Sequence, residues 1–220
     1  MSQLSDFTIA APRPLPVIVL ADVSGSMSEH GKIESLNHAL AEMLASFGSE
    51  SQEAAQIHVA VITFGGEAAE LHTALAPASS VKWNPMRASG RTPLGGAVAL
   101  ATTLVEDRTK IPGRAYRPVI VLASDGAPTD EWQKPIQQLL LSERGKRADR
   151  FALAIGDDAD KAMLGAFVND PARPVLAASD ARQIQKFFKW VTMSVTARSR
   201  SATPNATLPP PTTDFVLDEI

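Results

Sequence analysis

The chain has 220 residues, of which 45% are hydrophobic and 20% are charged, and this composition suits one α/β domain with a substantial buried core. Its formal net charge of -3 gives no electrostatic basis for a nucleic-acid partner, and the absence of cysteine excludes disulfides and thiolate metal sites. Residues 1–16 lack the basic and apolar regions of a signal peptide, and no apolar run approaches the ~20 residues of a membrane helix. We therefore expect a cytoplasmic protein without a membrane partner.

Strand and helix patterns alternate in the first half of the chain. Residues 15–21 form a continuous apolar run with β-branched side chains, which is typical of a strand buried on both faces. Apolar side chains recur at helical spacing over 32–47, and a second strand is predicted over 57–64. Residues 70–75 are predicted to form a short strand that pairs back with the second strand, and Pro93 is predicted to begin a helix.

The second half of the chain continues this alternation. Strands are predicted over 117–123, 150–155 and 174–177, and helices over 132–142, 161–167 and 182–196. The order of elements predicts an α/β fold with a central, mostly parallel sheet and helices on both faces. We expect about six strands, one of them a short antiparallel edge strand.

The composition also divides the chain. We predict an N-terminal extension over 1–13, a folded domain over 14–197 and a Ser/Thr/Pro-rich disordered tail over 198–220. A basic cluster stands near the middle of the second half and is interpreted as solvated surface. Its members are Arg144, Lys146, Arg147 and Arg150.

Three loops bring small oxygen-bearing side chains to the predicted carboxyl-terminal edge of the sheet, where the functional crevice of such folds lies. The loops are Asp22-Val23-Ser24-Gly25-Ser26, Ser89-Gly90-Arg91-Thr92-Pro93 and Ser124-Asp125-Gly126. Hydroxyls and carboxylates are hard oxygen ligands of the kind that Mg²⁺ prefers. The candidate metal-site residues are therefore Asp22, Ser24, Ser26, Thr92 and Asp125.

Each part of this pattern also has an ordinary structural interpretation. Ser26 or Ser28 could cap the first long helix, and Thr92 before Pro93 is a good helix cap. Asp125-Gly126 is a common turn pair. The parts occur together, in order and at strand ends, and this coincidence favours a metal site.

The whole pattern resembles the metal-ion-dependent adhesion site of von Willebrand factor type A domains, which have a Rossmann-like fold. The resemblance covers residues 14–197. It implies that Ser24 and Ser26 ligate Mg²⁺ directly and that Thr92 does so when a partner is engaged. It implies that Asp22 and Asp125 act mainly through water. It further implies a protein partner whose acidic side chain completes the coordination of the ion, with Mn²⁺ or Ca²⁺ as substitutes for Mg²⁺.

Within that family, the opening segment from Arg13 to Met27 and the segment Ser124-Asp125-Gly126-Ala127-Pro128-Thr129-Asp130 look like those of TerY-type tellurium-resistance proteins. That subfamily is associated with a Ser/Thr kinase and a PP2C-type phosphatase. The resemblance therefore implies an adaptor in a bacterial tellurium-resistance or stress-response system that is regulated by phosphorylation.

An enzyme is the alternative class of function. A carboxylate after the first strand, near Mg²⁺, is also the arrangement of phosphatases with an aspartate nucleophile, which would be Asp22 here. Such enzymes use a second Asp two positions later as a proton carrier, and this position is Ser24. Because no phosphate-binding loop motif occurs either, we expect an interaction module and not an enzyme.

Overall fold

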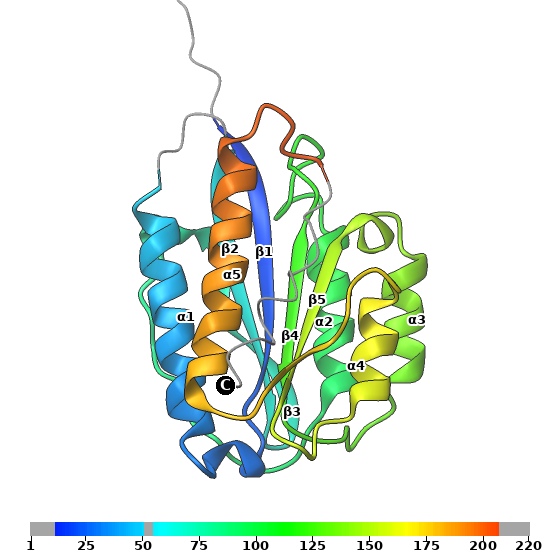
Figure 1. Cartoon of the computed structure of the whole chain (residues 1–220). Coiled ribbons are helices and arrows are strands. Elements are labelled where there is room, and N and C mark those ends of the chain that lie inside the picture. Colours follow the sequence, from blue (N-terminus) through cyan, green and yellow to red (C-terminus); the bar gives the residue numbers. More distant parts are fainter. Residues whose placement is uncertain (1–11, 51–54, 207–220) are drawn as a thin grey trace, which may run out of the picture.

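A computed structural model describes residues 12–50 and 55–206 and contains a central sheet (Figure 1). The strand order is β3-β2-β1-β4-β5-β6. The strands are β1 (Arg13–Asp22), β2 (Ala55–Gly65), β3 (Ala68–Pro77), β4 (Val119–Ser124), β5 (Asp149–Ile155) and β6 (Leu176–Ala178). All neighbouring strands are parallel except β2 and β3, which are antiparallel. The predicted fold class is confirmed.

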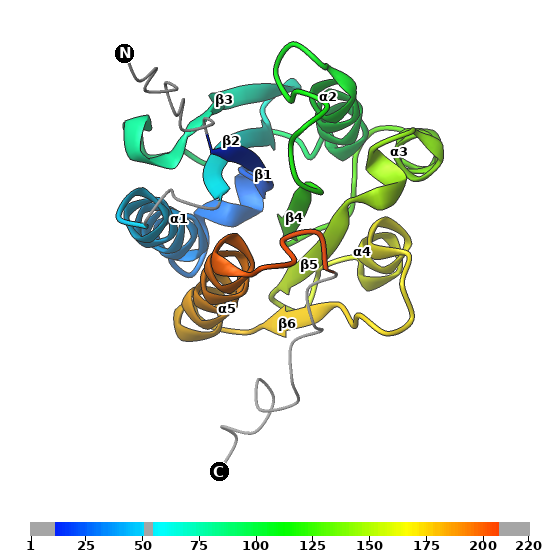
Figure 2. The same ribbon diagram turned by 90° about the horizontal axis from the view of Figure 1, so that it is seen from above.

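Helices cover both faces of the sheet, as Figure 2 shows from above. α1 (Lys32–Gly48) and α5 (Ala181–Arg200) lie on one face, and α2 (Leu94–Glu106), α3 (Gln133–Leu141) and α4 (Lys161–Val168) lie on the other. The described part of the chain also contains the short 3₁₀ helices η1 (Gly25–Ser28), η2 (Ala78–Ser80) and η3 (Gly145–Arg147). Within the described residues, none of the helices has the length and apolarity needed to cross a membrane.

The apolar run of β1 explains why the sheet has two cores. Val17 and Val19 pack into the core under α1 and α5, whereas Ile18 and Leu20 pack into the core under α2 and α4. Successive side chains of a strand point to opposite faces, so a strand covered on both faces must be apolar at every position. This pattern fixes β1 at the centre of the sheet and places its last residue, Asp22, at the carboxyl-terminal edge.

The antiparallel edge strand is longer than predicted. We expected a short strand over 70–75, but β3 spans ten residues and pairs with β2 along much of its length. Its pairing with β2 is irregular between Val59 and Ile62. β3 contains many exposed and half-buried positions, so its sequence lacks the continuous apolar run that marks the inner strands.

The carboxyl end of the folded domain also differs from the prediction. α5 continues past the predicted end at 196 to Arg200, and Arg198 and Ser199 are buried. The predicted start of the tail at residue 198 therefore lies inside α5. Arg198 belongs to the folded domain, because it donates a hydrogen bond to the buried Asp149 carboxylate at 3.1 Å. A polar Arg/Ser composition gives no sign of that distant counter-charge.

Parts of both predicted terminal segments lie outside the described residues. They are 1–11 of the N-terminal extension and 207–220 of the predicted tail. β1 begins at Arg13, so the predicted start of the domain at 14 falls one residue inside the first strand.

The basic cluster is only partly solvated. Lys146 and Arg147 are exposed, as predicted, but Arg150 is buried and donates hydrogen bonds to the carbonyls of Phe167 and Gly145. Arg144 is half-buried and donates to carbonyls at the end of α2 and in the loop that follows it. Two of the four cations therefore fix loops by satisfying backbone carbonyls.

Candidate metal centre

The three predicted loops meet at the carboxyl-terminal edge of the sheet because their strands are neighbours. β1 and β4 are parallel, and Ala21 of β1 is paired with Ala123 of β4. Asp22 and Ser124 therefore leave the sheet side by side, and Asp125 follows directly. Thr92 precedes α2 and is also buried.

Hydrogen bonds join three of the candidate side chains into one chain of oxygens. The hydroxyls of Ser24 and Ser26 lie 3.1 Å apart, and the Ser26 hydroxyl donates to Asp125 Oδ1 at 2.8 Å. The other oxygen of Asp125, Oδ2, accepts from the Lys32 ammonium at 2.8 Å. Ser24 and Asp125 are buried, whereas Ser26 is exposed, so the oxygens can be reached from solvent at Ser26.

Asp22 lies beneath this chain of oxygens and is fully buried. Its Oδ1 accepts from the backbone N–H of Ser24 at 2.8 Å, and its Oδ2 accepts from the Ser124 hydroxyl at 2.6 Å. Burial raises the pKa of Asp22, the hydrogen bonds from Ser124 and Ser24 oppose this rise, and the nearby charge of Asp125 adds to it. Asp22 therefore fixes the shape of the loop from below.

Thr92 is held separately from the other four candidates. Its N–H donates to the Thr129 hydroxyl at 3.1 Å, and its carbonyl accepts from the Thr129 N–H at 2.9 Å. Within the described residues, no hydrogen bond links the Thr92 hydroxyl to Asp22, Ser24, Ser26 or Asp125. The structure thus joins four predicted residues by hydrogen bonds and fixes Thr92 through its backbone.

The two helix-cap interpretations are wrong, whereas Asp125 and Gly126 do lie in a bend. The N-cap residue of α2 is Pro93, and in the described part of the chain no hydrogen bond joins the Thr92 hydroxyl to an N–H group of this helix. The first N–H groups of α2 are instead satisfied by Asp130, which accepts from Gly95 and Gly96 at 2.9 Å each. α1 likewise has no side-chain cap, because Ser26 lies in the separate turn η1. These hydroxyls are therefore free of the capping role.

Glycines allow the first two loops to touch each other. The Gly25 N–H donates to the Gly90 carbonyl at 3.0 Å, and Gly90 forms an isolated bridge with Gly66. Gly90 has a φ of 68°, and a Cβ at this position would lie 2.5 Å from the Cα of Gly66. Only glycine fits such an approach, so the sequence of this loop fixes its distance from the Asp22–Ser26 loop.

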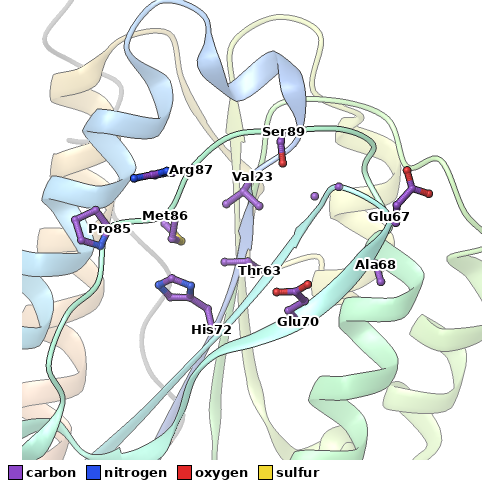
Figure 3. Close-up of a pocket in the computed structure, with 12 residues that line it drawn as sticks. Val23, Thr63, Glu67, Ala68, Glu70, His72, Pro85, Met86, Arg87 and Ser89 are labelled. Atoms are coloured by element: carbon purple, nitrogen blue, oxygen red, sulfur yellow. The ribbon is translucent and has the colours of Figure 1, made fainter.

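A cavity of about 210 Å³ lies beside the site, between the loop after β1, the strands β2 and β3, and the 85–89 segment (Figure 3). Val23, the residue between Asp22 and Ser24, forms part of its wall. Glu67, Glu70 and Arg87 give the cavity charges of both signs. These charges therefore line a cavity that adjoins the Asp22–Ser26 loop at Val23.

The oxygens of the site suit a hard divalent cation. Within the described residues, no group of three or more His, Asp or Glu side chains is placed to hold a metal ion, so a metal at this edge needs hydroxyl ligands. Neighbouring ligands of an octahedral Mg²⁺ lie about 3 Å apart. The separation of 3.1 Å between the Ser24 and Ser26 hydroxyls matches that spacing, and Asp125 holds the Ser26 hydroxyl from 2.8 Å.

Comparison with known families agrees with this geometry. The sequence profile of the von Willebrand factor type A domain matches residues 17–190. The chain belongs to the von Willebrand factor type A domain family. Domains of this family commonly hold a divalent metal at a metal-ion-dependent adhesion site and are generally interaction modules. No curated protein sequence matches the chain.

Solved structures show the same von Willebrand factor A fold. Proximal thread matrix protein 1 from the mussel byssus, with a zinc-occupied adhesion motif, is 16% identical at a TM-score of 0.64, over 85% of this chain and 48% of that one. A von Willebrand factor type A protein from Catenulispora acidiphila is 19% identical at a TM-score of 0.65, and the match covers 84% of this chain and 43% of that protein. The ArnB paralog VWA2 from Sulfolobus acidocaldarius is 15% identical at a TM-score of 0.58, and the match covers 86% of this chain and 46% of that protein. This chain matches less than half of each of these proteins.

Sequence reasoning assigned no role to two residues that contact the site, Lys32 and Ser124. Ser124 precedes Asp125, but only the pairing of β1 with β4 shows that its hydroxyl faces Asp22. Lys32 carried a usable signal, because a cation is unfavourable in the first turn of a helix. Such a residue suggests a compensating anion elsewhere in the fold.

Proposed function

We propose that this domain binds a protein partner through a divalent cation, Mg²⁺ in the first instance, held at the Asp22–Ser26 loop. The observation that carries the proposal is the pair of Ser24 and Ser26 hydroxyls, which lie 3.1 Å apart as neighbouring ligands of one octahedral ion do. The Asp125 carboxylate holds the Ser26 hydroxyl, and the pair is open to solvent at Ser26. Mn²⁺ or Ca²⁺ could take its place, since both also accept oxygen ligands.

In this proposal each residue of the chain has a defined task. Ser24 and Ser26 offer direct hydroxyl ligands, and Thr92 offers a third hydroxyl when the partner is engaged. Asp22 and Asp125 act mainly through water and hold the hydroxyls in position. The bound cation would supply a positive centre that attracts an acidic side chain of the partner.

The surroundings of Asp22 support binding over hydrolysis. A nucleophilic carboxylate needs an oxygen that can approach a substrate. Asp22 is fully buried, and both of its oxygens accept hydrogen bonds from Ser24 and Ser124. The residue two positions later is Ser24, a poor proton carrier, so we propose no catalytic role for this edge.

We further propose a TerY-type adaptor within a bacterial tellurium-resistance or stress-response system, with a Ser/Thr kinase and a PP2C-type phosphatase as partners. The segment from Ser124 to Asp130 supports this assignment, because the resemblance to TerY-type proteins includes it. Thr203 and Pro204 follow α5 in the described part of the chain, and Thr203 is exposed, so this Thr-Pro pair is open to a kinase. We place the adaptor in the cytoplasm.

The test is capture of partners by the full chain in Mg²⁺ and in EDTA. Wild type and Ser28→Ala should retain a partner in Mg²⁺ and lose it in EDTA. Asp22→Ala and Ser26→Ala should retain at least tenfold less, by loss of metal affinity. Ser28 is the matched control, because its hydroxyl donates to the Gly25 carbonyl and, among the described residues, not to a candidate ligand. Equal capture by Ser26→Ala, or by wild type in EDTA, would contradict a metal-dependent adhesion site.

A further inference from the structure

Lys32 places a positive charge directly on the candidate metal site. It is the first residue of α1, and its ammonium lies 2.8 Å from Oδ2 of Asp125. The Asp125 side chain is fully buried and the Lys32 side chain is 16% exposed, so solvent screens this ion pair only weakly. Within the described residues, Lys32 is the cation that forms an ion pair with a carboxylate of the site.

The position of Lys32 is costly for the helix itself. The N-terminus of an α-helix carries a partial positive charge, so a cation in the first turn is unfavourable. Two residues in the left-handed region, His30 with a φ of 53° and Gly31 with a φ of 69°, lead the chain into α1. The ion pair with Asp125 offsets the unfavourable position of the ammonium at the helix terminus.

The Lys32 side chain also has acidic neighbours away from the metal site. It forms part of the wall of a cavity of about 250 Å³ that is also lined by Glu29, Asp157 and Asp158. Lys32 therefore lies between the Asp125 carboxylate and a second group of acidic side chains.

We propose that Lys32 is the built-in counter-cation of the metal site and sets the affinity of the site for divalent ions. Without metal, the Lys32 ammonium holds Asp125 in place and offsets the repulsion between Asp125 and Asp22. With metal, the same ammonium repels the ion and lowers its affinity. The two carboxylates balance a divalent ion, so Lys32 leaves one net positive charge on the loaded site, which favours an acidic partner. This inference rests on the proposed function.

The experiment is a calorimetric titration of the full, chelator-treated chain with MgCl₂. Lys32→Gln removes the charge, and Lys32→Met repeats the test with an apolar side chain. Both should bind Mg²⁺ about tenfold more tightly than wild type, because a like charge near the ion is gone. Lys32→Arg should bind as wild type does. Lys82→Gln, an exposed lysine in the loop after η2, is the control and should also match wild type.

Thermal unfolding separates this role from a merely structural one. In EDTA, Lys32→Gln should unfold at a lower temperature than wild type, because Asp22 and Asp125 lose their counter-charge. In saturating MgCl₂ the difference should vanish or change sign. A lysine that served only the fold would lower the unfolding temperature equally in both conditions, and that result would overturn the proposal.

The remaining outcomes distinguish this inference from the proposed function. If wild type and Lys32→Gln bind Mg²⁺ with equal affinity, the role of Lys32 is overturned and the metal site stands. If neither protein binds Mg²⁺, both proposals are overturned. If only the Lys32 variants bind Mg²⁺ measurably, the role of Lys32 is supported and the wild-type site needs its partner to hold the ion.

Discussion

Asp22 is a carboxylate buried where charge is unfavourable. Its two oxygens accept hydrogen bonds from Ser24 and Ser124, but burial dominates and raises its pKa above the ordinary value of 3.8. The folded protein therefore binds a proton at Asp22 more tightly than the unfolded chain does. The contribution of this residue to the free energy of unfolding is fully present below pH 3.8, the ordinary pKa. It decreases as pH rises through the folded pKa and is lost above that value.

Asp22→Asn removes this charge while keeping the shape of the side chain. In EDTA at pH 7 the variant should be more stable than wild type, because the folded protein no longer holds a charged carboxylate where burial disfavours charge. At pH 3 the advantage should disappear. Urea unfolding at both pH values measures this. A variant less stable than wild type only at pH 7 would contradict the argument from burial.

The metal response of the same variant should change in the opposite direction. Wild type should gain about 2.7 kcal/mol of stability at an Mg²⁺ concentration one hundred times its dissociation constant. Asp22→Asn should lose most of that gain at the same concentration, because the site lacks one of its two carboxylates.

At the scale of elements, α2 depends on a contact that its own sequence does not contain. Asp130, in the loop after β4, accepts from the N–H groups of Gly95 and Gly96. A Cβ on Gly95 would lie 1.9 Å from the Glu131 carbonyl oxygen, so glycine permits this close docking. Thr129 in the same loop bonds the backbone of Thr92. One loop therefore caps α2 and positions a candidate ligand.

Asp130→Ala should cost about 1–2 kcal/mol in urea unfolding, the usual range for loss of an acidic helix cap. It should also weaken Mg²⁺-dependent partner capture, because the loop that holds Thr92 loosens. Asp130→Asn keeps one acceptor oxygen and should lose less stability. Equal stability of Asp130→Ala and wild type would show that solvent caps α2 as well as Asp130 does.

The cap of α2 shows where sequence patterns succeed and where they do not. Periodicity located β1, β4 and α2 because each buries a regular row of apolar side chains. Strand order then placed Asp22 and Asp125 at one edge, since parallel strands end on the same side. The partners that complete the site, Lys32 and Ser124, reach it through long-range contacts. A cation in the first turn of α1 suggests that Lys32 has an anionic partner, but no local pattern identifies that partner as Asp125 or shows that Ser124 faces Asp22.

At the scale of the whole molecule, the edge of the sheet opposite the candidate site is closed by a buried ion cluster. Asp149, at the start of β5, accepts from Arg173 at 2.8 Å and from Arg198 at 3.1 Å. All three residues are buried. Burial lowers the pKa of Arg198 to about 10, although the Asp149 charge opposes the shift, so Arg198 stays charged at pH 7. The cluster ties α5 and the loop before β6 to the central sheet.

Arg198→Met should lower the free energy of unfolding by about 3 kcal/mol, because it removes one partner of a buried ion pair and leaves the Asp149 charge poorly compensated. Arg200→Met is the matched control, two residues away on α5. Arg200 is 63% exposed and its partner Glu50 is 12% exposed, so solvent screens this ion pair more than the buried one and its loss should cost less, about 1 kcal/mol. Urea unfolding of both variants measures the difference. Similar losses would mean that Arg173 and Arg117, which also pair with Asp149, compensate its charge sufficiently. In that case α5 is held mainly by its apolar face, through Phe187, Val191 and Val195.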